Sequence, residues 1–216
     1  MRRDSGGFML MTAGMRITRL VLFSAALAVV SPGAIFAQET VAPASVKAKA
    51  PDLRAVFSPY LGTWKGEAKV MNAEQQPLSV LGVEQRYHWE TAGAVLAGEA
   101  VYTAKDREGK TVTVTVHSRT TVRDGEIFAE LTQGKETERF TALVDEDGFL
   151  VFIPEGTPKG KTPEKLTTTR VETEQAQTVI RVRGFERITI PDKEGKPRQA
   201  VLLLEGKLVK QPEKDR

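Results

Sequence analysis

Apolar and polar side chains alternate with a period of two along most of the chain from residue 62 onward. The clearest run is 111–117 (TVTVTVH), where three valines occupy one face and three threonines and His117 the other. Such alternation is typical of half-buried β-strands. Further strand-like runs lie at residues 64–70, 84–90, 95–102, 127–131, 149–153, 180–183 and 201–204. The pattern predicts an all-β chain.

Short polar segments separate these runs. Asp124-Gly125, Gln133-Gly134 and Asp147-Gly148 are dipeptides that suit tight hairpin turns. Their spacing predicts about eight to ten strands joined mainly by hairpins. Closure of such a meander removes the exposed edges of the sheet. The sequence therefore predicts an antiparallel up-and-down β-barrel, with a β-sandwich as the second choice.

A different pattern precedes the strands, at residues 52–61 (DLRAVFSPYL). Leu53, Val56 and Phe57 recur at helical spacing, and Asp52 is a good N-cap. Pro59 ends the run. We expect a short N-terminal helix here.

Residues 1–37 have the layout of a secretory signal peptide. Arg16 and Arg19 precede an apolar run at 20–30, helix breakers follow, and Ala37 precedes polar residues. The apolar run is too short to span a bilayer comfortably. We expect cleavage after Ala37, no stable membrane anchor afterwards and a periplasmic or secreted location, with an uncleaved anchor as the alternative. Met1 and Met15 are both candidate start residues.

The rest of the chain divides into a flexible linker at 38–51, the barrel at 52–211 and a charged tail at 212–216. The whole chain has 31 Lys and Arg and 28 Asp and Glu. Without the four arginines and one aspartate of residues 1–37 these numbers are equal, so the formal net charge is zero. The sequence therefore shows no excess of basic residues of the kind that binds nucleic acid. It has no cysteine, which excludes disulfides and thiol chemistry.

The stretch 60–67 (YLGTWKGE) stands where the helix should meet the first strand. Alternation points Trp64 inward, where its ring can plug one end of a barrel. Gly62 permits the sharp change of direction, and Gly66 is expected to leave room beside the ring. A short helix followed by Gly-x-Trp resembles the calycin superfamily of lipocalins and fatty-acid-binding proteins, and LGTWKGE is similar to nitrobindin-like barrels and their bacterial relatives.

The resemblance implies a barrel with an internal cavity for a small apolar molecule. Two departures qualify it. Lipocalins stack an arginine of the last strand on the motif tryptophan, where this chain offers Lys207 and Lys210. Nitrobindins hold haem through a late histidine, whereas this chain has none after His117. No cofactor and no metal are expected.

Four aromatic side chains fall on the inferred inner faces of the first three strands: Trp64, Tyr87, Trp89 and Tyr102. They form either plain core packing or the wall of a ligand pocket. Phe128, Leu150 and Phe152 are assigned to the opposite, outer face. Apolar residues there suggest a wall that is covered, either by the N-terminal helix or by a second copy in a homodimer.

Catalytic signals are weak. His88, His117 and Glu99 fall on outward faces, and the chain has no Gly-x-Ser-x-Gly and no phosphate loop. The sequence favours an exported binding or carrier protein for a small apolar ligand, without catalytic chemistry. The alternatives are a structural or interaction barrel of the cell envelope, and a hydrolase or isomerase with a scattered site inside the barrel.

Overall fold

The computed structural model describes residues 52–212 except 107, 159 and 193. The expected signal peptide, the linker at 38–51 and all but residue 212 of the tail lie outside the described residues. The elements are α2 (Leu53–Phe57), η1 (Ser58–Tyr60), β1 (Gly62–Asn72), β2 (Pro77–Thr91), β3 (Val95–Lys105), β4 (Thr111–Arg123), β5 (Glu126–Gln133), β6 (Glu136–Val144), β7 (Leu150–Pro154), β8 (Lys165–Glu174), β9 (Gln177–Pro191) and β10 (Pro197–Lys210).

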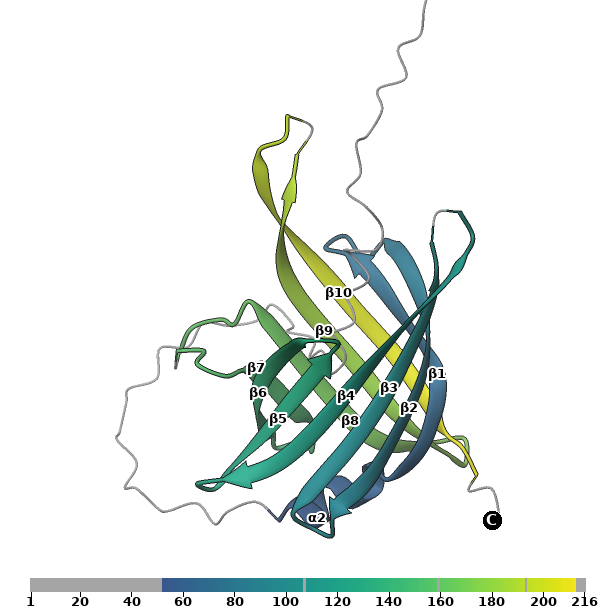
Figure 1. Cartoon of the computed structure of the whole chain (residues 1–216), viewed down its shortest axis with the longest axis vertical. Coiled ribbons are helices and arrows are strands. Elements are labelled where there is room, and N and C mark those ends of the chain that lie inside the picture. Colours follow the sequence, from purple (N-terminus) through teal and green to yellow (C-terminus); the bar gives the residue numbers. More distant parts are fainter. Residues whose placement is uncertain (1–51, 107, 159, 193, 213–216) are drawn as a thin grey trace, which may run out of the picture.

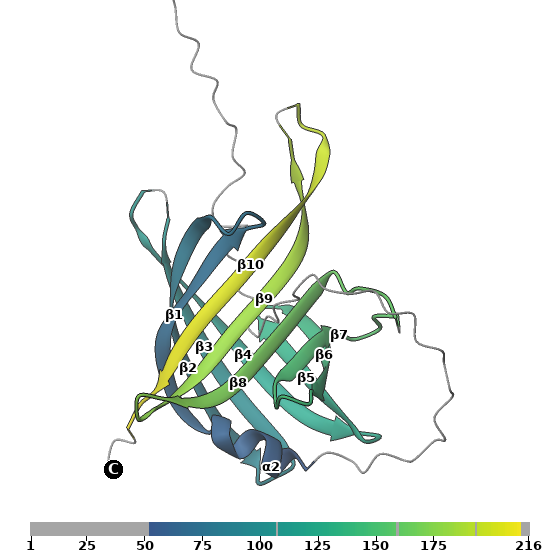
Figure 2. The ribbon, with the colours of Figure 1, turned by 180° about the vertical axis from the view of Figure 1, so that it is seen from behind.

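The ten strands form one closed antiparallel barrel (Figure 1). Each strand pairs with its neighbours in the chain, and β1 also pairs with β10, from Trp64 opposite Lys210 to Asn72 opposite Leu202. Figure 2 shows β1, β10, β9 and β8 side by side on the wall that faces the viewer there. The expected up-and-down barrel with a short N-terminal helix is confirmed, and the sandwich alternative is wrong.

Three of the hairpin loops share one design. They begin at Asp106, Asp145 and Asp192, and each carboxylate accepts hydrogen bonds from the backbone N–H groups two and four residues further on, at 2.7–3.0 Å. A glycine with a positive φ stands three residues after each aspartate: Gly109, Gly148 and Gly195. Only glycine adopts this conformation without strain. The Asp-x-x-Gly spacing therefore sets the direction of three reversals.

The helical segment closes the end of the barrel at which β1 begins (Figure 1). Asp52 caps α2 by accepting a hydrogen bond from the backbone N–H of Arg54 at 2.9 Å. Leu53 and Phe57 are buried. Because α2 is too short to be stable alone, its packing on the barrel interior must hold it in place.

Trp64 connects this helical segment to the barrel. Its ring is fully buried, and Nε1 donates a hydrogen bond to the carbonyl oxygen of Tyr60 at 2.7 Å. The Tyr60 hydroxyl in turn donates to the carbonyl oxygen of Thr169 on β8 at 3.1 Å. The expected inward position of Trp64 is confirmed, and the two bonds join η1 to β1 and β8.

The two glycines beside Trp64 are required for different structural reasons. Gly62 has a φ of +104°, which confirms that it permits the turn into β1. A side chain at Gly66 would place its Cβ 2.0 Å from the carbonyl oxygen of Lys207. Gly66 is therefore required by the close approach of the β10 backbone, and the expectation that it also makes room for the indole stays a prediction.

A lysine covers the indole from the last strand. Lys210 pairs with Trp64 across the β1–β10 seam, and its Nζ lies 5.4 Å from the centroid of the ring. Such a cation–π contact adds about 0.5–1 kcal/mol at a partly exposed site.

The outer-face assignment is wrong for two of its three residues. Leu150 is 2% exposed, and both Leu150 and Phe152 line the interior. Register places them there, because Phe152 pairs with the buried Ala142 of β6. Phe128 does lie outside, with the guanidinium of Arg123 5.0 Å from its ring centroid.

Ion pairs tie the outer sides of β8, β9 and β10 together. Arg181 donates hydrogen bonds to Glu172 at 2.9 Å and to Glu174. Lys207 donates to the other oxygen of Glu174 at 2.6 Å. Lys207 and Arg181, through these bonds, lower the pKa of Glu174 to about 2.

Trp64→Ala should destabilise the fold strongly, because it removes a fully buried ring and leaves a cavity. Changes of this kind cost on the order of 3–5 kcal/mol. Lys69→Ala, an exposed position on the same strand, should change the free energy of unfolding by about 0.5 kcal/mol or less. Urea melts measure both. Equal and small losses of stability in the two variants would contradict the inference that the Trp64 ring fills the end of the barrel.

The Glu174 cluster should make stability depend on pH in the acid range. A carboxylate whose pKa is lowered in the folded state stabilises that state at pH values above its unfolded pKa of about 4.5. This contribution is lost as pH falls toward about 2. Urea melts of wild type and Glu174→Gln between pH 6 and pH 3 should therefore converge as pH falls. Glu136→Gln, an exposed change on β6 away from the cluster, should run parallel to wild type. A constant gap for Glu174→Gln would contradict the assignment.

Candidate functional site

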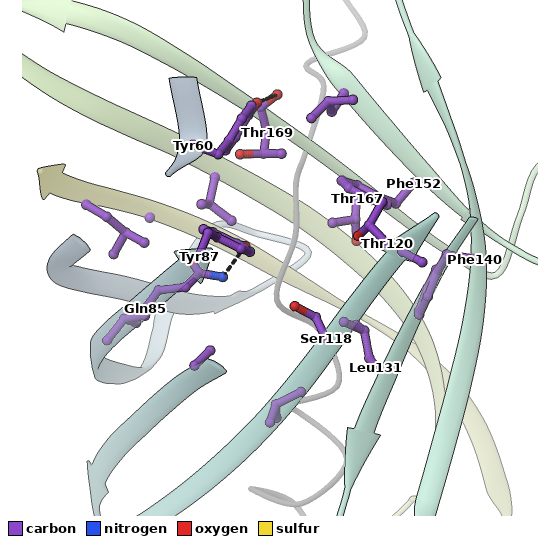
Figure 3. Close-up of a pocket in the computed structure, with 18 of the residues that line it drawn as sticks. Tyr60, Gln85, Tyr87, Ser118, Thr120, Leu131, Phe140, Phe152, Thr167 and Thr169 are labelled. Carbon is purple, nitrogen blue, oxygen red and sulfur yellow. Dashed lines mark hydrogen bonds between the residues drawn. The ribbon is translucent and has the colours of Figure 1, made fainter. Parts of the chain in front are cut away.

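A cavity lies inside the barrel (Figure 3). Its volume, counted as the space open to the centres of water-sized spheres, is about 70 Å³. This is enough for several waters or for a small organic molecule. It is smaller than the ~300 Å³ at which drug-sized pockets begin.

The wall of the cavity is mainly apolar, and all ten strands and the helical segment contribute residues to it. Among the described residues that line it, none is charged. The polar members are hydroxyl or amide side chains: Tyr60, Gln85, Tyr87, Tyr102, Ser118, Thr120, Thr167 and Thr169. An apolar wall with a few uncharged polar groups is the usual composition of a small-molecule site.

Tyr87 is held in the cavity wall by a hydrogen bond and by close packing of its ring. Its hydroxyl oxygen accepts a hydrogen bond from Nε2 of Gln85 at 2.5 Å (Figure 3). Its ring lies against Gly98, where an added Cβ would sit 2.7 Å from two ring carbons. Gly98 pairs with Tyr87 across β2 and β3, so the missing side chain of the glycine provides the space for the ring.

Tyr60 adds a second phenol next to the first. The Tyr60 and Tyr87 rings meet edge to face, with centroids 6.4 Å apart and an interplanar angle of 86°. Burial raises the pKa of both phenols, and the neighbouring Tyr102 and Tyr60 raise that of Tyr87 further. Both phenols therefore stay protonated and uncharged at neutral pH.

Figure 3 shows further hydroxyl side chains of β4 and β8 in the cavity. Ser118 and Thr120 belong to β4, and Thr167 belongs to β8. Phe140, Phe152 and Leu131 stand among them (Figure 3). Ser118 lies next to the Tyr87 ring, because both stand beside Gly98 of β3. Thr120 and Thr167 lie near Phe152 instead (Figure 3).

A pair of charged side chains lies where β8 begins, at the end of the barrel away from α2. The Lys165 side chain is only 8% exposed, and its Nζ donates a hydrogen bond to Glu138 at 2.5 Å. The same Nζ lies 5.3 Å from the centroid of Phe140, which lines the cavity. This ion pair therefore borders the cavity without lining it.

The four aromatic residues expected from the sequence do not all reach the cavity. Tyr87 and Tyr102 line it. Trp64 is buried in the core beside it, and Trp89 is partly buried and packs against the same core. The structure therefore brings two of the four to the cavity wall and leaves the two tryptophans as packing.

Alternation could have found several lining residues that the sequence reasoning missed. Gln85 has the same parity as Tyr87 on β2, and Ser118 and Thr120 continue the valine face of β4. Thr167 and Thr169 gave no signal, because β8 carries threonines on both faces. Tyr60 precedes the first strand, where alternation does not apply.

His88, His117 and Glu99 are exposed on the outer wall, as expected. Within residues 52–212, as far as they are described, no three His, Asp or Glu side chains come together in a way that could hold a metal ion. In the same part of the chain, no helix is long and apolar enough to cross a membrane.

Comparisons with known proteins do not identify a family for this chain. No protein-family model and no curated protein matches this chain. One solved structure that it resembles is a Nostoc punctiforme protein of unknown function from the DUF3598 family, with 9% sequence identity. That match covers 73% of this chain and 99% of the other, with a TM-score of 0.20. A likeness this weak carries no argument about function.

Gly98→Ala should displace the Tyr87 ring. The added Cβ would lie 2.3 Å from Oγ of Ser118 and 2.7 Å from the ring, and overpacking of this kind typically costs 1–3 kcal/mol. Ala97→Val is the control, because Ala97 pairs with the exposed His88 and Arg119 and so faces outward. Denaturant melts and the NMR signals of the Tyr87 ring measure the effect. Unchanged ring signals in Gly98→Ala would contradict the contact.

Proposed function

We propose that the barrel binds a small, uncharged and mainly apolar molecule in its interior. The observation that carries the proposal is the cavity, whose described lining residues are all uncharged. A charged ligand would lose its hydration there without gaining an opposite charge, which is costly. An apolar ligand with one or two polar atoms loses little and gains contact with the wall.

The size of the cavity narrows the class of ligand. A volume of about 70 Å³, small beside the ~300 Å³ at which drug-sized pockets begin, suits a molecule such as a small cyclic or branched ketone, alcohol or ester. A long-chain lipid does not fit without movement of the wall.

The chemistry of the tyrosines supports binding over catalysis by these groups. A phenol with a raised pKa is a poor base and a poor nucleophile at neutral pH, and this holds for Tyr60 and Tyr87. Two of the three residues that suggested an apolar outer face, Leu150 and Phe152, belong to the cavity instead. That weakens the support for a structural or interaction barrel.

The finer assignment is that the protein is calycin-like and acts as an exported carrier. Gly-x-Trp at the start of β1 supports the first part, as does Lys210, which lies over the indole from the last strand. The segment at 15–37 supports export to the periplasm or beyond. A mass spectrum of protein isolated in its native state from the cell envelope would detect a bound ligand.

Cavity filling tests the binding site directly. Ala100 lines the cavity and is 6% exposed, so Ala100→Leu should occupy part of the space and abolish binding of a small probe such as cyclohexanone. Ala97→Leu, on the outer side of the same strand, should bind as wild type does. Titrations followed by backbone amide chemical shifts measure both.

Wild type that shows no shifts at cavity residues at saturating probe would contradict the proposal. The same holds if Ala100→Leu binds the probe as tightly as Ala97→Leu does.

A further inference from the structure

Among the described residues, the Tyr87 hydroxyl accepts a hydrogen bond but donates none. Its hydroxyl oxygen accepts the Nε2 proton of Gln85 at 2.5 Å. A phenol has one proton and can also accept, so this bond leaves the Tyr87 proton available. Among the described residues the hydroxyl makes no other hydrogen bond. The Tyr87 side chain is partly buried and lines the cavity, so this proton is within reach of a molecule bound there.

The neighbouring phenol has the opposite arrangement. The Tyr60 proton is already donated to the carbonyl oxygen of Thr169 at 3.1 Å. Of this edge-to-face pair of rings, only Tyr87 can therefore donate to a molecule in the cavity without breaking a bond of the protein.

Resting on the proposed function, we infer that Tyr87 donates a hydrogen bond to an acceptor oxygen of the bound molecule, so that the ligand class is a small uncharged carbonyl, ester or ether compound. Donation from Gln85 polarises the phenol and strengthens it as a donor. No cation lines the described wall, so a carboxylate is disfavoured relative to a neutral oxygen.

The donor is also held in place before any ligand arrives. The missing side chain of Gly98 leaves the space that the Tyr87 ring occupies. The Tyr60 and Tyr87 rings also pack edge to face, with 6.4 Å between their centroids. A side chain that is already ordered loses little entropy on binding. The hydroxyl therefore contributes to selectivity between ligands of equal size.

Two probes of nearly equal shape test this inference: cyclohexanone, which has an acceptor oxygen, and methylenecyclohexane, which has a CH₂ group in its place. Dissociation constants for both are measured by amide chemical shifts in wild type and in Tyr87→Phe. The preference for the ketone should fall by about fivefold in Tyr87→Phe, as expected for the loss of one neutral hydrogen bond. The C=O stretching band of bound cyclohexanone should lie at lower wavenumber in wild type than in Tyr87→Phe.

An equal preference in both proteins, with the same carbonyl band, would overturn the inference and leave the proposed function standing, because both probes would still bind. Failure of wild type to bind either probe would overturn the proposed function and this inference with it.

Discussion

The pairing of β1 with β10 is the constraint on which the rest of the molecule depends. It closes the sheet, so every strand has two neighbours and no long edge is left open. Close approach at the seam requires glycine at position 66, whose missing side chain admits the backbone of β10. The seam also brings Lys210 over Trp64. Without this closure the inner faces of the strands would not enclose a cavity.

At the end of the barrel near α2, a continuous series of contacts joins the helical segment to the cavity. Trp64 donates to Tyr60, and Tyr60 donates to Thr169 on β8. The same Tyr60 ring then packs on Tyr87. The residues that seal the barrel are thus continuous with those that shape the cavity, and the position of the phenol pair depends on the helical segment as well as on the sheet.

The fold was predictable because alternation and turn chemistry agree with each other along most of the chain. On β4 a strict alternation of valine and threonine separates the two faces unambiguously, and Ser118 continues the valine face. On β7 the residues Leu150 and Phe152 and the residues between and after them are all apolar, so alternation cannot tell inside from outside. Only the pairing with β6 decides it, because Phe152 lies opposite the buried Ala142. A cavity was expected from the resemblance and was one of two interpretations of the inward aromatic residues, but its volume depends on side-chain packing that no pattern records.

The meander has a consequence for how the protein reaches its native state. Nearly every strand pairs with the strand that follows it, so most of the chain can form through short loops whose entropic cost is small. The β1–β10 seam is different, because it joins the two ends of the barrel domain. Non-local pairings of this kind slow folding. We expect the hairpins to form early and the seam to form last, which makes the seam, and not the hairpins, the step that determines the folding rate.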